Sequence, residues 1–216
     1  MPKTLIERLS WFVLLSAMLM TAVVFVHSER RGRPGSNAGV GHSVFLMDRP
    51  VGNFRLTNQF DIPVTRPALE GFVWVVDVIF SRCPGQCHQL SQQMREVQKR
   101  LPVGAPVRLV SLTADPEYDT PAVLAKYGRR YGYDTNNWLF LTGPKVDVYG
   151  LAVKELLFSV VEQPEGTRVS LNDLFIHSTA FALVDRRGHL RGVVQGELTN
   201  AVDQIVHQVE QLLRDR

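Results

Sequence analysis

The sequence predicts an α/β domain in which helices flank a central mixed sheet, preceded by a membrane-spanning helix. Three observations carry this prediction. Apolar runs of strand length alternate with segments of helical period after residue 51, 45% of the 216 residues are hydrophobic, and residues 9–26 hold no charge. A chain of this length can bury one sizeable core, so we expect a single folded domain.

Residues 1–27 are predicted to be an uncleaved signal anchor. The run Leu9–Val26 approaches the roughly 20 residues that a helix needs to cross a hydrocarbon core. A cleaved signal peptide is the alternative, but its apolar region usually has about 7 to 15 residues and ends in small ones. This run ends in Val-Phe-Val-His instead. Basic residues flank both sides, so the positive-inside rule does not assign an orientation.

Residues 28–50 are predicted to be a flexible linker, because they are rich in Gly, Ser, Arg and Pro and lack apolar periodicity. The folded domain should then occupy residues 51–216. The formal charge of +3 is mild and the arginines are scattered, so we expect no nucleic-acid partner.

Two strands and two helices are expected in the first half of the domain. Phe72–Phe80 has the composition of a buried central strand. Pro84–Leu101 has apolar or small residues three or four apart, which predicts a helix with Pro84 in its first turn, where a missing N–H costs nothing. Val107–Thr113 is the next strand. Thr120–Tyr131 opens with a capping Thr and a first-turn Pro, and is predicted to be helical.

The second half is predicted to close with a hairpin and a helix. Trp138–Thr142 is expected to be a short strand and Val146–Phe158 a helix. Thr179–Asp185 and Leu190–Gln195 pair through a turn at residues 186–189. Asn200–Leu213 carries its apolar residues on one helical face. Because a cysteine pair directly follows the first strand and opens its helix, this order of elements is thioredoxin-like.

The chain has only two cysteines, Cys83 and Cys87. In the first turn of a helix, residues four apart share one face, and the backbone N–H groups and helix dipole there favour thiolates. This arrangement suits a disulfide or a two-sulfur metal clamp. The alternative is that both cysteines are only small buried apolar side chains. Two cysteines together at a strand-to-helix junction favour a role in disulfide formation or metal binding instead.

A third ligand would distinguish metal binding from electron exchange. His177 stands just before the hairpin, a position that faces the start of the cysteine helix in a thioredoxin-like sheet. Redox proteins of that fold usually have a cis-proline there, but no proline follows Gly166. Two thiolates and an imidazole form a soft, three-ligand set that Cu(I) prefers, whereas structural zinc normally takes four ligands. The pair could bind metal when reduced and lose it when oxidised to a disulfide.

With these residues in place, the chain resembles the SCO/SenC family of thioredoxin-like copper proteins. The matching stretches cover most of residues 51–216 and are "FRLTNQFD" (54–61), "WVVDVIFSRCPGQC" (74–87), "SLTADPEYDTPAVLAKYGRRYG" (111–132) and "HSTAFALVDRRGHLRG" (177–192).

The resemblance implies that Cys83, Cys87 and His177 bind copper, as Cu(I), Cu(II) or both. It implies that the protein delivers copper to the binuclear copper site of cytochrome c oxidase subunit II, reduces the cysteines of that site, or serves another copper-site apoprotein. It also implies a single-pass protein of the inner membrane whose domain faces the periplasm.

Two residues near the pair depart from the family pattern. The family often has a proline after the second cysteine, where this chain has His88, and a threonine where this chain has Ser81. His88 follows Cys87 by about 100° around a helix, so we expect it to point away from the sulfurs.

Three acidic residues are candidates for supporting roles. Asp77 lies inside an apolar strand, six residues before Cys83, where thioredoxins keep a buried acid that handles a proton for the second cysteine. A structural aspartate bonded to backbone or water is the alternative. Asp115 should lie at the same sheet end as the cysteines and either orient His177, contact a partner or form an ordinary turn. Asp119 is expected to be a turn or cap residue.

Three functions therefore remain open at the level of sequence. The first is a metallochaperone for copper, and the second is a thiol–disulfide reductase, which is the enzymatic alternative. The third is a redox-sensing module that uses the cysteines without stable metal. Replacing His177 separates the first two, because copper binding needs the imidazole and disulfide exchange does not.

Overall fold

The computed structural model describes residues 47–134, 136–167 and 174–215. The predicted signal anchor and nearly all of the predicted linker lie outside these residues. None of the described helices has the length and apolar character needed to cross a membrane.

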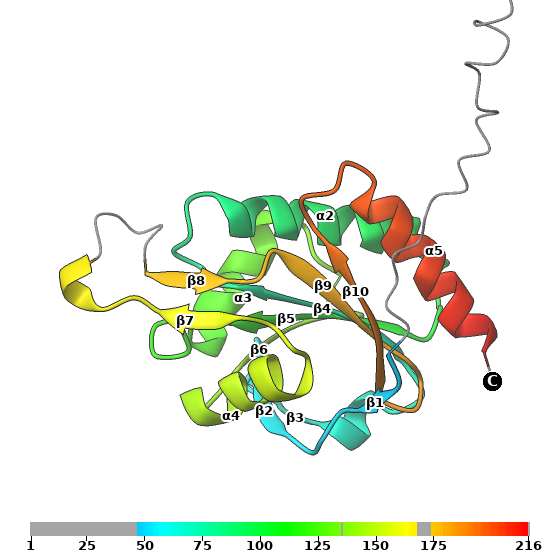
Figure 1. The fold of residues 1–216 in the computed structure, drawn as a ribbon, viewed down its shortest axis with the longest axis horizontal. Coiled ribbons are helices and arrows are strands. Elements are labelled where there is room, and N and C mark those ends of the chain that lie inside the picture. The colour runs from blue at the N-terminus through cyan, green and yellow to red at the C-terminus, as the bar shows by residue number, and fades with distance from the viewer. Residues whose placement is uncertain (1–46, 135, 168–173, 216) are drawn as a thin grey trace, which may run out of the picture. The chain divides into compact units, whose positions relative to one another are not determined.

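A mixed sheet of eight strands forms the centre of the domain, in the order β1-β10-β9-β4-β5-β6-β2-β3 (Figure 1). Strands β4, β5 and β6 are parallel, and the remaining neighbours pair antiparallel. The strands are β1 (Arg49–Pro50), β2 (Arg55–Asn58), β3 (Pro63–Thr65), β4 (Val73–Ile79), β5 (Val107–Thr113), β6 (Trp138–Thr142), β9 (Ala180–Val184) and β10 (His189–Gln195).

The helices cover both faces of this sheet, as the sequence predicts. Figure 1 shows α2 and α5 above the sheet and α4 below it. Tyr127 of α3 bonds Ser91 of α2 through their hydroxyl groups, at 2.8 Å, so α3 packs beside α2. The helices are α2 (Gln86–Arg100), α3 (Pro121–Arg130), α4 (Lys145–Tyr149) and α5 (Ala201–Arg214), with 3₁₀ turns η1 (Arg66–Leu69) and η3 (Glu165–Thr167).

Local sequence explains most of these elements. All seven residues of β4 are buried, which fits a strand in the centre of the sheet and accounts for a run that is apolar except at Asp77. The hydroxyl oxygen of Thr120 accepts a hydrogen bond from the Val123 backbone N–H at 3.4 Å, so the predicted cap of α3 is confirmed.

The helix predicted at Val146–Phe158 is confirmed only in part. After α4, the chain continues as a π-helical turn, η2 (Gly150–Glu155), and the helix ends there. Leu157 then adopts a positive φ of 62°, a conformation that an L-residue avoids inside a helix. This reversal directs the chain into β7.

A second, two-stranded sheet was not predicted from the sequence. It pairs β7 (Val160–Glu162) with β8 (Phe175–His177) antiparallel, with Val160 opposite His177. Each strand has three residues, too few for a period of two to be recognised. Figure 1 places β8 beside the start of α2, so this small sheet carries His177 to the cysteine end of the domain.

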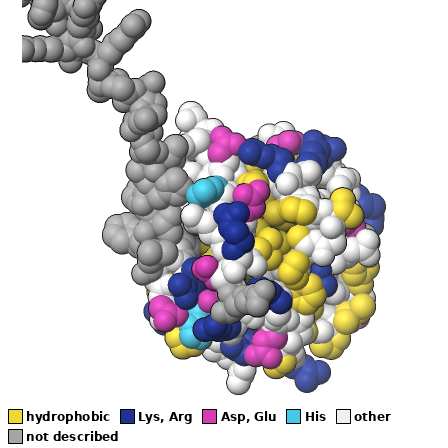
Figure 2. Space-filling view, turned by 90° about the vertical axis from the view of Figure 1, so that its right-hand side faces the viewer, with side chains coloured by type: hydrophobic (Ala, Val, Ile, Leu, Met, Phe, Trp, Pro, Cys, Tyr) yellow, Lys and Arg dark blue, Asp and Glu magenta, His cyan; other side chains and the backbone are white. Residues whose placement is uncertain are grey.

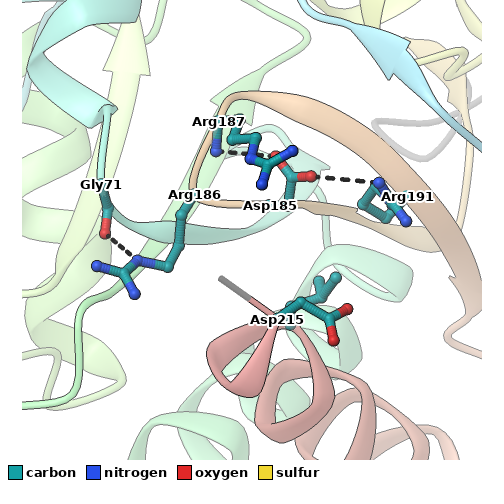
Figure 3. Close-up of a pocket in the computed structure, with 7 residues that line it drawn as sticks. Gly71, Asp185, Arg186, Arg187, Arg191 and Asp215 are labelled. Atoms are coloured by element: carbon teal, nitrogen blue, oxygen red, sulfur yellow. Dashed lines mark hydrogen bonds and ion pairs between the residues drawn. The ribbon is translucent and has the colours of Figure 1, made fainter.

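A surface hollow of about 790 Å³ lies at the other end of β4, away from the cysteines. Several of its side chains make contacts at its wall (Figure 3): Arg191 Nη1 lies 3.4 Å from Asp185 Oδ2, and Arg186 Nε donates to the Gly71 carbonyl oxygen at 3.1 Å. Figure 2 views the molecule from this side and shows basic side chains interspersed with acidic ones. The hollow takes no part in the chemistry of the cysteines.

Candidate metal centre

The cysteines lie where β4 gives way to α2. The chain leaves the strand at Ile79, and α2 begins at Gln86 after Gly85, whose φ of −132° and ψ of −91° are not helical. Cys87 is therefore the second residue of the helix, whereas Cys83 and Pro84 lie in the loop before it. The prediction that Cys83 and Pro84 belong to the first helical turn is wrong, because the Gly85 backbone starts the helix later.

The structure brings Cys83, Cys87 and His177 together. The Sγ of Cys87 lies 3.1 Å from Nε2 of His177, and one ligand atom from each of the three residues lies within 4.8 Å of the others. Cys87 and His177 are buried, while Cys83 is only partly buried. The expected meeting of a late histidine with the cysteine pair is thus present in the fold, with one of the two cysteines less buried than the other.

The two thiols are free and differ in acidity. Hydrogen bonds from Cys87, His177 and the backbone N–H groups of Cys87 and Gly85 lower the pKa of Cys83 to about 4, against the opposing effect of burial. Burial raises the pKa of Cys87, and the neighbouring Cys83 raises it further. Cys83 is therefore the thiolate at neutral pH, and Cys87 keeps its proton until a metal or a base removes it.

Two contacts orient the imidazole of His177. Its Nδ1 lies 3.1 Å from the carbonyl oxygen of Ser178, and its ring packs edge-to-face on Phe80 with centroids 5.7 Å apart. The Ser178 backbone N–H donates to the Ser159 carbonyl oxygen at 2.9 Å, which ties this segment to the chain before β7. With the proton on Nδ1, the lone pair of Nε2 faces Cys87 and is free to bind a metal.

The three donors fit a single soft ion. Bonds of about 2.0–2.3 Å, as zinc makes to His and Cys, place two ligand atoms roughly 3.5–4 Å apart. The three donor atoms already lie within 4.8 Å of one another, so small adjustments of side chains suffice. Two sulfurs and one nitrogen form the ligand type that Cu(I) favours.

Asp77 lies in the strand behind the cysteines and is completely buried. Among the described residues, neither of its carboxylate oxygens has a hydrogen-bond partner within normal distance. Burial raises the pKa of Asp77 to about 7, while Ser111 and the charge of His177 act in the opposite direction. The charge of Asp77 also contributes to raising the pKa of Cys87, after burial and Cys83.

Asp115 lies at the predicted end of the sheet but does not orient His177. Its carboxylate pairs with Arg82, with Oδ2 2.5 Å from Nη2, and the partner of His177 Nδ1 is Ser178 instead. The guanidinium of Arg82 also lies over the ring of Tyr118, 4.2 Å from its centroid. Asp115 therefore holds the residue next to Cys83 rather than the histidine.

Asp119 stands at the end of a turn, as the sequence suggested, but it is not a helix cap and its side chain binds elsewhere. Its buried side chain accepts hydrogen bonds from the Ser81 backbone N–H at 3.0 Å, the Ser81 hydroxyl and the Thr113 hydroxyl at 2.5 Å. The cap of the following helix is Thr120. Sequence reasoning missed this link between the cysteine loop and β5, since no local pattern records a contact between residues 38 positions apart.

His88 points away from the sulfurs, as expected. Its Nδ1 lies 2.9 Å from the hydroxyl of Tyr131 at the end of α3, and its Nε2 lies 2.8 Å from Nε2 of Gln92. Both ring nitrogens are thus engaged outside the cysteine site, and His88 is not a fourth donor in this structure.

Comparisons with known proteins agree with this geometry. The SCO1/SenC family model matches residues 46–214. The SCO1 protein homolog of Bacillus subtilis (strain 168) is 32% identical over 159 residues, which cover 73% of this chain and 79% of the homolog. The structure of BsSco, a member of the Sco family of cytochrome c oxidase assembly proteins, matches with 30% identity and a TM-score of 0.67, covering 80% of this chain and 97% of that one.

The fold extends to a structure with copper bound. ScoI of Bradyrhizobium japonicum, solved with copper, has 20% identity and a TM-score of 0.59, and the match covers 76% of this chain and 99% of ScoI. At this identity the likeness shows a shared fold. The thioredoxin-like architecture, the cluster of two cysteines and a histidine, and the match over residues 46–214 lead to one conclusion: this chain belongs to the SCO1/SenC family.

Proposed function

We propose that this protein is a copper chaperone that binds Cu(I) through Cys83, Cys87 and His177 and passes it to a copper-site apoprotein. The observation that carries the proposal is the convergence of the three donor atoms within 4.8 Å, with one sulfur partly exposed. Copper suits this site better than structural zinc because the donor set is soft and has three members.

The difference in exposure between the two sulfurs supports transfer rather than permanent storage. Cys87 and His177 are buried and would hold the ion from the protein side, while Cys83 is partly exposed and has a lowered pKa. An incoming thiolate or imidazole of a partner can replace Cys83 first, so the ion moves by stepwise exchange of ligands. No fully uncoordinated ion is then required.

The proposed acceptor is cytochrome c oxidase subunit II. Family membership supports this choice, as does the similarity to BsSco, which is described as a member of a family of cytochrome c oxidase assembly proteins. We further propose that the apolar run Leu9–Val26 anchors the protein in the inner membrane, with the domain in the periplasm.

A second candidate, thiol–disulfide reductase, is favoured by Asp77. The Cys83 thiolate would attack a disulfide of the acceptor, releasing one acceptor thiolate and forming a mixed disulfide. Cys87, giving its proton to Asp77, would then attack the Cys83 sulfur, releasing the second acceptor thiolate and leaving a Cys83–Cys87 disulfide. Two electrons pass from the cysteine pair to the acceptor. The buried carboxylate, which has no hydrogen-bond partner in the part of the chain that the structure describes and whose pKa is raised to about 7, suits this proton transfer.

Titration of the reduced full-length protein with Cu(I) against a competing chelator tests the proposal. We expect one ion per chain, and an affinity lower by more than about 100-fold after His177→Ala, because loss of a ligand costs more than the roughly 10–100-fold that loss of an outer partner costs. His88→Ala is the matched control, since His88 is bonded to Tyr131 and should leave copper affinity unchanged. If the wild type does not bind copper and the His177→Ala variant still carries out disulfide exchange, the results favour the reductase. If Cys83 and Cys87 become oxidised but the protein passes neither metal nor electrons to subunit II, the results favour a redox sensor.

A further inference from the structure

The loop that carries Cys83 has one buried attachment to the central sheet. The carboxylate of Asp119 is fully buried and accepts hydrogen bonds from the backbone N–H and the hydroxyl of Ser81, two residues before Cys83. The same carboxylate accepts a hydrogen bond from the hydroxyl of Thr113, the last residue of β5. One side chain thus joins the cysteine loop to the end of a strand.

That strand is a rigid support. β5 pairs with β4 over seven residues and with β6 on its other side. Cys83 itself lies in neither a helix nor a strand, and its backbone N–H bonds only locally, to the Phe80 carbonyl oxygen at 3.1 Å. The position of Cys83 relative to Cys87 therefore depends on how the preceding loop is attached.

The Asp119 side chain is not needed for the turn in which it stands. The backbone N–H groups of Tyr118 and Asp119 both bond the Asp115 carbonyl oxygen, at 3.1 and 2.8 Å, and Thr120 caps α3. The carboxylate is left to bind Ser81 and Thr113. Burial raises the pKa of Asp119, while its bonds to Ser81 and Thr113 oppose that rise, so these bonds stabilise the carboxylate in its buried place.

A second acid holds the next residue of the loop from outside. Asp115 pairs with Arg82, whose side chain is 34% exposed, so water competes for that contact. The Asp119 carboxylate is completely buried and its bond to Thr113 is buried, whereas Ser81 is partly exposed, so water competes less for these bonds than for the Arg82 contact. Removing the carboxylate leaves the Ser81 backbone N–H and hydroxyl without this partner. Asp119 is therefore the stronger of the two attachments.

We propose that Asp119 is a positioning residue for Cys83, which holds the cysteine loop at the distance from Cys87 and His177 that copper binding and disulfide closure require. The first test of this role, which measures Cu(I) affinity, rests on the proposed copper function. It concerns geometry and not charge, so an uncharged side chain of the same shape should serve. Asparagine keeps one oxygen for the Ser81 N–H and the Thr113 hydroxyl, and its amide can donate to the Ser81 hydroxyl, which reverses direction.

The test compares full-length Asp119→Ala, Asp119→Asn and a matched control, Gln59→Ala. Gln59 is also buried and makes two hydrogen bonds, to the Trp138 carbonyl oxygen and from the Phe140 N–H, each of 2.9 Å. These lie on β6, away from the cysteine loop. We expect Asp119→Ala to weaken Cu(I) binding about tenfold or more, as loss of a side chain that orients metal ligands does, and the other two variants to stay close to wild type.

A second readout does not depend on copper. The reaction of the reduced pair with oxidised glutathione gives the Cys83–Cys87 disulfide and two molecules of reduced glutathione. Its equilibrium constant measures how well the two sulfurs are placed, and we expect Asp119→Ala to lower it about tenfold. If the wild type failed to bind Cu(I), the proposed copper function would fall, and this equilibrium would still decide the role of Asp119.

Three results would overturn the inference: unchanged affinity and disulfide equilibrium in Asp119→Ala, equal losses in Gln59→Ala, or a loss in Asp119→Asn as large as in the alanine variant. Should Asp119→Ala fail to fold, Ser81→Ala removes only the hydroxyl partner. It should then show a smaller loss in the same direction, and no loss would equally reject the role.

Discussion

The Nε2 atom of His177 lies 3.1 Å from the Sγ atom of Cys87, although 90 residues separate the two along the chain. Both side chains are buried, and the other cysteine, Cys83, is partly buried beside them. Because one of the three ligand residues is less buried than the other two, the site is approached from the side of Cys83. The predictions below follow from that asymmetry and from the groups around it.

Cys83 should react with iodoacetamide far faster than Cys87. It is only partly buried and its pKa is lowered to about 4, whereas burial raises the pKa of Cys87. A thiol with a pKa near 4 is already ionised at pH 6, so the rate should stay nearly constant between about pH 6 and 8. Mass spectrometry of wild type and Cys83→Ser measures both sites. A rate that climbs about tenfold per pH unit over this range would mean an ordinary thiol.

Asp77→Asn should change how stability depends on pH. The pKa of Asp77 rises from 3.8 in the unfolded chain to about 7 in the fold, so the folded state binds this proton more tightly. Its contribution to stability is complete below about pH 4 and is lost as pH rises toward 7. Relative to wild type, the variant should gain about 2–4 kcal/mol between these pH values. Urea unfolding of both proteins across this range gives the difference, and parallel curves would contradict the buried charge.

Gly196→Ala should disturb the metal site through the segment that carries His177. An added Cβ would lie 2.7 Å from both the Thr179 carbonyl oxygen and Leu90 Cδ2, and the Gly196 N–H bonds that same carbonyl. We expect a loss of about 1–3 kcal/mol in the free energy of unfolding together with weaker Cu(I) binding.

Gly128→Ala provides the control for this prediction. There an added Cβ would lie 2.7 Å from Phe140 and 2.9 Å from Tyr133, in the packing of α3 against β6. It should destabilise the protein by a similar amount and leave copper affinity intact. Equal effects of the two variants on copper binding would show that the loss at Gly196 is a general consequence of instability.

Leu157→Gly should stabilise the protein slightly. Leu157 has a φ of 62° and a side chain that is largely exposed, so its conformation costs energy without much packing in return. Glycine adopts this conformation freely, and we expect a gain of roughly 0.5–1 kcal/mol in thermal or urea unfolding. A lower stability would mean that the leucine side chain contributes packing beyond its exposed surface.

Local patterns in the sequence predicted most of the central architecture. The apolar run of β4, the helical period of α2 and α5, and the Thr-Pro start of α3 depend on residues close together in the chain, and the structure confirms each of them. The π-helical turn at 150–155 and the three-residue strands β7 and β8 have no such local signature. They lie where the chain passes from α4 to the cysteine end of the sheet, so their conformation depends on the surrounding fold.

The residue types of the site could also be predicted, since only two cysteines exist and one histidine precedes the closing hairpin. The partners of the acids could not. Asp115 binds Arg82 and Asp119 binds Ser81, and both contacts cross more than 30 positions of sequence. Which donor reaches which carboxylate depends on how two loops meet at one edge of the sheet.

The sequence by itself thus determined the order of the main strands and helices, the choice of sulfur and imidazole as donors, and the resemblance to a family of copper proteins. The tertiary structure alone decided that Cys87 is buried and Cys83 only partly so, that Asp77 has no hydrogen-bond partner among the described residues, and that Asp119 joins the cysteine loop to β5. The physical reason is that burial and long-range hydrogen bonds are properties of the packed chain, which no short stretch of residues contains.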